Sequence, residues 1–209
     1  MSEAMTGQIE NRILAVGASP RKGGNSDLLL EQFAAGAAGS GVDTEIVQLR
    51  DLQFSPCVGC EQCRTTKSCT RFDDDMCPLY PKLVAARGLI LISPVHNYNL
   101  TAWMKAFIDR LYCFYDFEEP RPGPWGSRLA GQGRQALVAA VCEQVGRKDM
   151  GFTLEALQMP LEALGYRVHE PFPVLGLFGR GAVAKEAPVL AGAEAAGARL
   201  ACALQSPAA

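Results

Sequence analysis

The chain has 209 residues, of which 48% are hydrophobic and 20% are charged, and its formal net charge is -2 at pH 7. This length suits one α/β domain with a complete core. The balanced charge gives no electrostatic basis for binding nucleic acid or an anionic membrane, and no apolar run reaches the roughly 20 residues of a membrane-spanning helix. Because residues 1–10 are polar and lack the apolar core of a secretory signal, we expect a cytoplasmic protein whose eight cysteines are not disulfide-bonded.

The first predicted strand, which ends at Val16, is followed by a polar loop and then by a helix whose apolar stripe begins at Leu28. The loop, residues 17–26, reads Gly-Ala-Ser-Pro-Arg-Lys-Gly-Gly-Asn-Ser. A helix N-terminus offers unpaired N–H groups and a positive dipole end, and glycine lets the backbone approach an anion. The spacing matches neither the Rossmann motif nor the P-loop, so we predict a monophosphate site, with an ordinary strand-to-helix turn as the alternative. The candidate contacts are Ser19, Arg21, Gly24, Asn25 and Ser26.

Strands and helices alternate along the rest of the chain. Further strands are predicted at residues 44–49, 89–92, 136–142 and 166–174, and helices at residues 28–38, 79–84, 100–111, 154–164 and 185–204. Pro160 is expected to kink or split its helix. This alternation predicts a doubly wound, five-stranded parallel sheet with helices on both faces, a three-layer α/β/α fold. The outer strands are the more polar ones, which favours the order 2-1-3-4-5.

In that order the first and third strands are neighbours whose connections leave in opposite directions, and ligands bind at their carboxyl ends. The loop after the third strand, Ser93 to Thr101, offers backbone amides, side-chain amides and aromatic faces. These groups suit a flat heteroaromatic ring with polar edges, so we predict a flavin, with a solvent-facing loop as the alternative. The candidate ring contacts are Pro94, Val95, His96, Asn97, Tyr98 and Asn99. Lys105 and Asp109, spaced i, i+4, are expected to form a surface ion pair.

Residues 51–77 make a long excursion between the second and third strands that contains Cys57-x2-Cys60-x2-Cys63-x5-Cys69. Zinc usually takes two separated Cys-x2-Cys pairs, whereas three closely spaced cysteines and a fourth are typical of ferredoxin-type clusters. The spacing therefore favours an iron-sulfur cluster, and zinc or a metal-free loop remain the alternatives. Cys77, which precedes a proline, competes with Cys69 as the fourth ligand.

Three further segments have a structural interpretation. Asp73, Asp74 and Asp75 precede the helix at residues 79–84 and are expected to cap it. The Pro/Gly-rich stretch at residues 120–133 is expected to be a flap or a subunit contact. The remaining cysteines are expected to be small buried apolar residues: Cys113, Cys142 and Cys202.

Two of these segments together resemble the NADPH-dependent FMN reductase family within the flavodoxin-like fold. Residues 17–26 resemble its FMN phosphate loop, and residues 93–98 with residues 104–110 resemble its flavin-ring segment and the following helix. The spacing of the four cysteines resembles the iron-sulfur flavoprotein subgroup of the same family. One departure is His96, because relatives usually carry Tyr or Trp there.

The resemblance implies an N-terminal tail at residues 1–11 and a single flavodoxin-like FMN-binding domain at residues 12–205 with a cysteine-rich insertion at residues 51–77. It implies an FMN-dependent oxidoreductase that moves electrons between a ferredoxin-like or NAD(P)H donor and a small acceptor. The ligands of its 4Fe-4S cluster are then Cys57, Cys60, Cys63 and Cys69.

Several alternatives stay open beside this interpretation. They are a cluster-free NAD(P)H-dependent FMN or quinone reductase, a flavodoxin-like electron carrier without turnover, and a zinc-stabilised binding module. No Ser-His-Asp or Cys-His catalytic arrangement is evident, and none is needed for flavin chemistry. The resemblance, together with the apolar and aromatic residues 111–117, predicts a homodimer or homotetramer.

Overall fold

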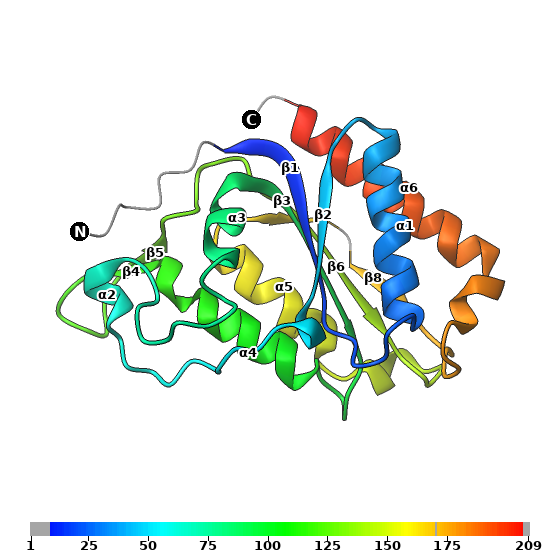
Figure 1. Cartoon of the computed structure of the whole chain (residues 1–209), viewed down its shortest axis with the longest axis horizontal. Helices are drawn as coiled ribbons and strands as arrows, with labels where there is room; N and C mark the ends of the chain where they lie inside the picture. Colours follow the sequence, from blue (N-terminus) through cyan, green and yellow to red (C-terminus); the bar gives the residue numbers. More distant parts are fainter. Residues whose placement is uncertain (1–8, 170, 207–209) are drawn as a thin grey trace.

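A parallel sheet forms the middle layer of the computed structural model, which describes residues 9–169 and 171–206 (Figure 1). Its order is β2-β1-β3-β6, and the two short strands β7 and β8 both pair with β6 at the far edge. The strand bounds are β1 Glu10–Gly17, β2 Thr44–Gln48, β3 Ala86–Pro94, β6 Gln135–Val141, β7 Arg167–Val168 and β8 Phe172–Val174. The predicted order 2-1-3-4-5 is confirmed, with the fifth position shared by β7 and β8.

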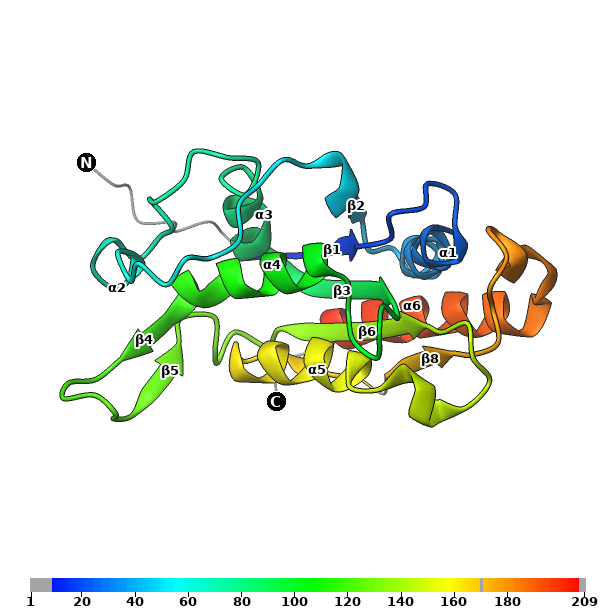
Figure 2. The same ribbon diagram turned by 90° about the horizontal axis from the view of Figure 1, so that it is seen from below.

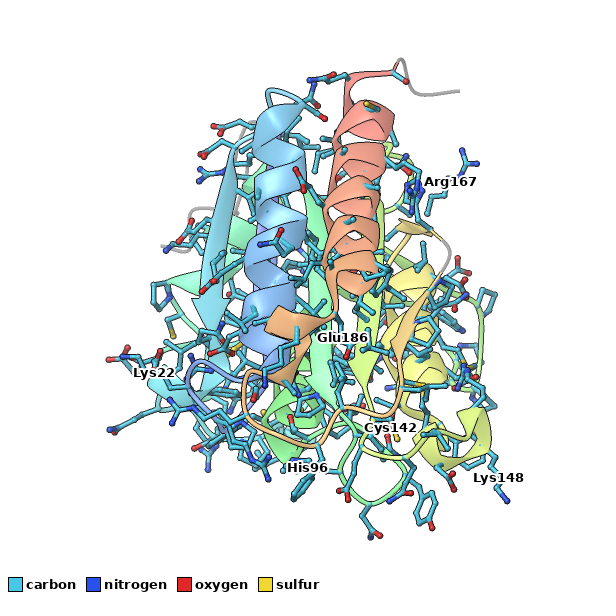
Figure 3. All side chains as sticks on the ribbon, turned by 90° about the vertical axis from the view of Figure 1, so that its right-hand side faces the viewer. Lys22, His96, Cys142, Lys148, Arg167 and Glu186 are labelled. Atoms are coloured by element: carbon cyan, nitrogen blue, oxygen red, sulfur yellow. The ribbon has the colours of Figure 1, made fainter. Side chains whose placement is uncertain are left out.

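Helices cover both faces of this sheet. On one face α1 and α6 lie side by side (Figure 3), and α3, α4 and α5 cover the other (Figures 1 and 2). The bounds are α1 Asn25–Gly39, α3 Leu79–Ala85, α4 Ala102–Arg110, α5 Thr153–Ala163 and α6 Ala187–Gln205. Alternate residues of β1 enter the two cores, Ile13 and Ala15 towards α1 and α6, and Leu14 and Val16 towards the other face. A strand buried on both faces needs the continuous apolar run that the sequence shows.

Two glycines allow α1 and α6 to pack at backbone distance. A Cβ atom on Gly36 of α1 would lie 1.8 Å from the carbonyl oxygen of Glu194, and one on Gly197 of α6 would lie 1.9 Å from that of Phe33. Within the described part of the chain, α6 is the one helix long and apolar enough to cross a membrane, by length and composition alone. Its buried face packs here on α1 and the sheet, as in the core helix of a globular domain.

We expect Gly36→Ala to destabilise the protein by about 1–3 kcal/mol or more, because the added methyl group meets rigid backbone on α6 rather than a mobile side chain. Gly39→Ala is the matched control on the same helix, since a Cβ atom there has nothing within 4 Å. That control should leave stability unchanged or raise it by about 0.4–1 kcal/mol. Urea unfolding measures both variants, and equal midpoints would contradict the close helix contact.

The structure corrects several predicted boundaries. The first strand begins at Glu10, within the predicted tail at residues 1–11, and residues 1–8 of that tail lie outside the described residues. Pro160 lies inside an unbroken α5, in its last turn, because a proline removes only one N–H donor and the helix ends soon after. The predicted strand at residues 166–174 is two short pieces, and of the three apolar cysteines Cys202 is exposed.

The excursion after β2 contains the short helices Leu49–Asp51 and α2 Cys63–Thr66. The Pro/Gly-rich stretch also has regular structure, because its strand β5 Trp125–Ser127 pairs antiparallel with β4 Tyr115–Phe117. Figure 2 shows this hairpin beside α2, away from the carboxyl ends of the central strands. The predicted flap is therefore a β-hairpin next to the cysteine loop.

Candidate functional site

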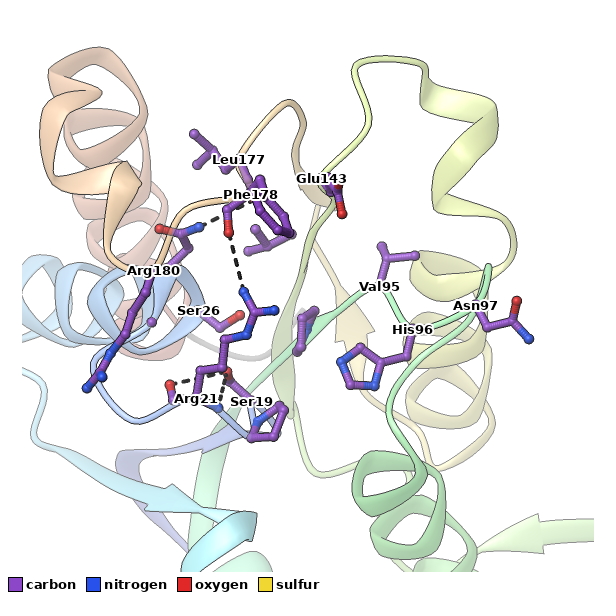
Figure 4. A pocket seen from close by; sticks show the side chains of 15 residues that line it. Ser19, Arg21, Ser26, Val95, His96, Asn97, Glu143, Leu177, Phe178 and Arg180 are labelled. Carbon is purple, nitrogen blue, oxygen red and sulfur yellow. Dashed lines mark hydrogen bonds between the residues drawn. The ribbon is translucent and has the colours of Figure 1, made fainter.

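A pocket of about 480 Å³ opens at the carboxyl ends of β1, β3 and β6 (Figure 4), and we call it the strand-end pocket. Its volume lies in the range of small-molecule and cofactor sites, about 300–1,000 Å³. The loop after β1 and the loop after β3 both border it, as the strand order requires. The predicted contacts that line it are Ser19, Arg21, Gly24, Asn25, Ser26, Pro94, Val95, His96 and Asn97.

The start of α1 gives this pocket an anion-binding end. The backbone N–H groups of Asn25 and Ser26 have no acceptor among the described residues, and no side chain caps the helix at Gly24. The Ser26 side chain is buried, lines the pocket and makes no hydrogen bond within the described chain. A Cβ atom on Gly24 would lie 2.9 Å from the carbonyl oxygen of Arg21, so the turn requires glycine. These free donors at a helix N-terminus suit a phosphate group.

A buried ion pair between Asp27 and Arg50 stabilises the loop at residues 17–26. The Asp27 carboxylate accepts the Gly23 N–H at 2.8 Å and pairs with the Arg50 guanidinium at 2.9 Å. Arg50 also donates to the Ser19 carbonyl at 3.1 Å, so both ends of the loop are held. Because Arg50 neutralises Asp27, the carboxylate does not repel an anion bound at the helix start.

Asn25 lines the pocket, and its side chain also forms hydrogen bonds with a distant part of the chain. Its side-chain amide donates to the Gly179 carbonyl at 3.0 Å, and its side-chain oxygen accepts the Val183 N–H at 3.0 Å. Asn25 therefore ties residues 177–183 to the start of α1. This segment brings Leu177, Phe178 and Arg180 to the pocket.

We expect Asn25→Ala to lower the free energy of unfolding by about 1–3 kcal/mol, because it leaves buried polar groups of residues 177–183 without partners. Limited proteolysis should also cut this segment faster. The control is Lys22→Ala, which removes an exposed side chain of the same loop that makes no hydrogen bond among the described residues, and it should leave stability unchanged. Equal proteolysis rates for the two variants would contradict the tethering role.

The loop after β3 makes a tight turn that divides the predicted ring contacts. His96 N–H donates to the Asn99 carbonyl at 2.8 Å, and Asn97 and Tyr98 take positive φ angles of 49° and 64° at the tip. His96 and Asn97 line the pocket, whereas Tyr98 and Asn99 do not; Tyr98 is 60% exposed. Periodicity does not reveal which residues of such a turn face inwards. The predicted Lys105–Asp109 ion pair is confirmed at 2.5 Å.

The third side of the pocket comes from residues that the sequence interpretation missed. Val141 is the last residue of β6, and Glu143 follows this strand. Because ligands bind at the carboxyl ends of parallel strands, these residues can be identified once β6 is known to lie beside β3. Phe178 contacts Arg21 of the loop after β1 (Figure 4). The Arg21 guanidinium donates to the Phe178 carbonyl at 3.3 Å and lies 5.8 Å from the centre of the Phe178 ring. The loop that carries Phe178 has no recognisable motif.

A second pocket, which we call the cysteine pocket, lies under the excursion after β2. All four predicted ligands line it, together with Cys113 from the segment after α4: Cys57, Cys60, Cys63 and Cys69. Cys77 is absent from its lining, and its thiol donates to the Phe72 carbonyl at 3.4 Å. Burial raises the pKa of the Cys63 thiol, and the charges of Cys69, Cys57 and Cys60 raise it further.

Four thiols around one pocket form the donor set of an iron-sulfur cluster that is held by cysteines alone. Within residues 9–169 and 171–206, no three His, Cys, Asp or Glu side chains come close enough together to hold a single metal ion. A cluster occupies more space than one ion, so its thiolates stand further apart than those around zinc. The four cysteines thus border one small pocket without forming a preformed single-ion site among the described residues.

The β4–β5 hairpin is attached to the cysteine loop by ion pairs. Glu61, between two of the cysteines, accepts from Arg121 at 2.8 Å and from Arg64 at 3.1 Å, and these hydrogen bonds lower the pKa of Glu61. Lys67 pairs with Asp116 at 2.5 Å, and Arg64 also pairs with Glu119. The hairpin thus braces the loop from outside.

The aspartates before α3 do not cap that helix, whose N-cap residue is Pro78. Asp74 instead forms a two-pronged ion pair with Arg110, at 2.7 and 3.0 Å. Burial alone would raise the pKa of Asp74, but the hydrogen bonds from Arg110 and from the Ser55 and Met76 N–H groups, with the charge of Arg110, together lower the pKa. Asp75 accepts the Gln53 N–H at 2.7 Å, so two of these carboxylates hold the excursion rather than α3.

The two pockets lie at opposite ends of α4. The strand-end pocket borders residues 94–97 before this helix, and the cysteine pocket borders residues 109–113 at its end. A nine-residue helix is about 13.5 Å long. The two sites are therefore distinct and are built from separate loops.

Comparison with known proteins gives one family match. The family model described as NADPH-dependent FMN reductase matches residues 11–162. An iron-sulfur flavoprotein of Methanocaldococcus jannaschii is 33% identical over 99 residues, which cover 47% of this chain and 51% of the relative. One from Archaeoglobus fulgidus is 34% identical over 130 residues, 61% of this chain and 58% of the relative. The chain thus spans about half the length of these curated relatives.

Solved structures share the fold at low sequence identity. A NADH:FMN oxidoreductase in its apo form has a TM-score of 0.65 at 21% identity, covering 94% of this chain and 91% of that chain. An azoreductase from Bacillus anthracis has a TM-score of 0.63 at 15% identity, covering 92% of this chain and 99% of that chain. These matches confirm the flavodoxin-like arrangement of the sheet and helices.

Proposed function

The chain belongs to the NADPH-dependent FMN reductase family, and on this premise we propose that it is an FMN-dependent oxidoreductase of the iron-sulfur flavoprotein type. FMN binds in the strand-end pocket, and a 4Fe-4S cluster binds in the cysteine pocket. The observation that carries the proposal is the strand-end pocket itself. Its free helix N-terminus and the loop after β3 meet at the carboxyl ends of the neighbouring strands β1 and β3.

Each side of the strand-end pocket has its own part in holding FMN. The N–H groups of Asn25 and Ser26, with the Ser26 hydroxyl and the Arg21 guanidinium, hold the phosphate. Residues 94–97 and Phe178 border the space for the ring. Bound there, FMN supplies the exchange of electrons either as a hydride or one at a time. The chain's task is to bind and orient that cofactor.

The cysteine pocket holds the one-electron centre in this proposal. Cys57, Cys60, Cys63 and Cys69 are its ligands, and Cys77 is not, since it lies outside the pocket lining. A ferredoxin-like protein or NAD(P)H acts as the donor, and a small molecule accepts the electrons. The names of the archaeal relatives support the cluster.

A cluster-free NAD(P)H-dependent FMN or quinone reductase is the second candidate. One observation favours it: the strand-end pocket is complete without any residue of the cysteine loop. The iron-sulfur flavoprotein proposal explains why four thiols surround one pocket, whereas a cluster-free reductase has no role for them. A flavodoxin-like carrier without turnover would bind FMN in the same place.

Turnover of anaerobically purified protein tests the proposed function. Under the first candidate, reduced ferredoxin or NADPH bleaches the flavin absorption, and an added quinone restores it over many cycles. A protein that binds FMN but shows no reduction by either donor is a carrier at most. Reduction by NADPH alone, in protein without iron, establishes the second candidate.

We further propose a homodimer or homotetramer of single-domain chains in the cytoplasm. The two pockets lie at opposite ends of α4. Exposed aromatic side chains at both ends, among them Tyr98 and Trp125, support such contacts. Light scattering at micromolar concentration should give a multiple of 22.4 kDa, and a mass of 22.4 kDa alone would contradict the assembly.

A further inference from the structure

One buried cation borders the cysteine pocket. The side chain of Arg110, the last residue of α4, is 0% exposed and lines that pocket beside the cysteines. Its Nε donates to the Tyr80 hydroxyl at 3.2 Å. Its Nη1 donates to the Ser55 carbonyl at 2.8 Å and to Asp74 at 2.7 Å, and its Nη2 donates to the other Asp74 oxygen at 3.0 Å.

These bonds hold both ends of the cysteine loop. Ser55 comes two residues before Cys57, and Asp74 comes five residues after Cys69. Asp74 also accepts the Ser55 N–H at 3.1 Å, so the entrance and the exit of the loop are joined to each other and to the end of α4. One ion pair thus joins the two ends of the segment that carries the four thiols.

The two members of this ion pair lie at different distances from the cysteine pocket, since only the positive one borders it. Arg110 lines the cysteine pocket and Asp74 does not, so the positive end of the pair faces the thiols. Burial alone would lower the pKa of Arg110, but the hydrogen bonds to Asp74 and Tyr80 and the charges of neighbouring groups together raise the pKa, so the guanidinium stays charged. Of the five N–H groups of a guanidinium, one on Nη2 has no acceptor among the described residues.

Positive charge and N–H donors near the sulfurs stabilise the reduced, more negative form of an iron-sulfur cluster, and its reduction potential rises. We propose that Arg110 is a positioning residue for the cysteine site, which holds the ends of the cysteine loop and raises the reduction potential of the cluster bound there. This inference rests on the proposed cluster. It adds a residue that is not a ligand and that determines at what potential the cluster accepts an electron.

The test compares three variants with the wild type, all purified anaerobically. Arg110→Lys keeps the positive charge but loses the planar guanidinium group that donates two hydrogen bonds to Asp74. The double variant Asp74→Asn with Arg110→Gln removes the pair without leaving a buried carboxylate unpaired. Arg134→Lys is the matched control, because Arg134 is a second buried arginine that bonds the carbonyls of Leu83, Val84 and Ala86 and does not border the cysteine pocket.

Iron, sulfide and FMN contents are measured first, and then the cluster potential by a redox titration followed by electron paramagnetic resonance. We expect a lower potential for the double variant, equivalent to about a tenfold change in the ratio of oxidised to reduced cluster, or 59 mV for a one-electron couple. Arg110→Lys should lie between it and the wild type. Arg134→Lys should keep the wild-type potential even if its melting temperature falls, and FMN content should stay unchanged throughout.

A double variant with the wild-type cluster content and potential would overturn the inference and leave the proposed function intact. Loss of the cluster from the double variant, with FMN retained and a normal cluster in Arg134→Lys, would support the positioning role. A wild type without iron or sulfide would overturn the proposed cluster itself, and that result is known before any variant is compared.

Discussion

Cys63→Ser is expected to remove iron and sulfide from the protein almost completely while FMN stays bound. Cys63 is the third cysteine of the closely spaced trio and begins α2, so no neighbouring thiol on the loop can replace it without moving that turn. The strand-end pocket contains no residue of the cysteine loop, so its structure should not change. One-electron exchange with ferredoxin should fall far more than direct two-electron reduction of the flavin.

Cys77→Ser is the matched control for this variant. Cys77 belongs to the same excursion but does not border the cysteine pocket, so its replacement should leave iron and sulfide at the wild-type level. Full iron content in Cys63→Ser would contradict the assignment of the ligands. Loss of the cluster from Cys77→Ser would instead make Cys77 the fourth ligand in place of Cys69.

The second large effect is expected at the phosphate loop. Replacing Arg21 and Ser26 together by alanine removes one charge-assisted hydrogen bond and one hydroxyl from the start of α1. Hydrogen bonds to charged groups each contribute about 1.5–3 kcal/mol, so FMN affinity should fall by about a hundredfold or more. Equilibrium dialysis or fluorescence titration of the apoprotein with FMN measures the change.

Lys22→Ala controls for the loss of a positive charge. Lys22 is exposed, adjoins Arg21 and does not line the pocket, so FMN affinity should change little. Unchanged affinity in the double variant would rule out the phosphate at the start of α1. An equal loss in Lys22→Ala would show that the long-range field, rather than direct contact, holds the phosphate.

The parts of the fold that the sequence predicts are those whose pattern follows from burial on both faces of a sheet. The apolar runs at β1, β3 and β6 identify three central strands, and the polar loops after β1 and β3 identify the site. In both cases the residues of one short segment indicate the surroundings of that same segment, either the buried sheet or the site at its edge. The four cysteines are recognisable for the same reason, since their spacing is a property of one short segment.

The features that the sequence did not reveal depend on contacts between distant segments. The side-chain bonds of Asn25 to residues 179 and 183 cannot be predicted from its place in the loop, because those partners lie more than 150 residues later. Asp74 resembles a helix cap, but its guanidinium partner lies on α4. Phe178 and the β4–β5 hairpin reach their sites through loops without a motif, and only tertiary structure places them.

The FMN, iron, acid-labile sulfide and zinc contents of anaerobically purified wild-type protein test the central claim most directly. The account predicts about one FMN, four iron atoms and four sulfides per chain, with no zinc, and broad absorption near 400 nm beneath the flavin bands. Protein that contains zinc without sulfide and retains no flavin would contradict both the cluster and the FMN site.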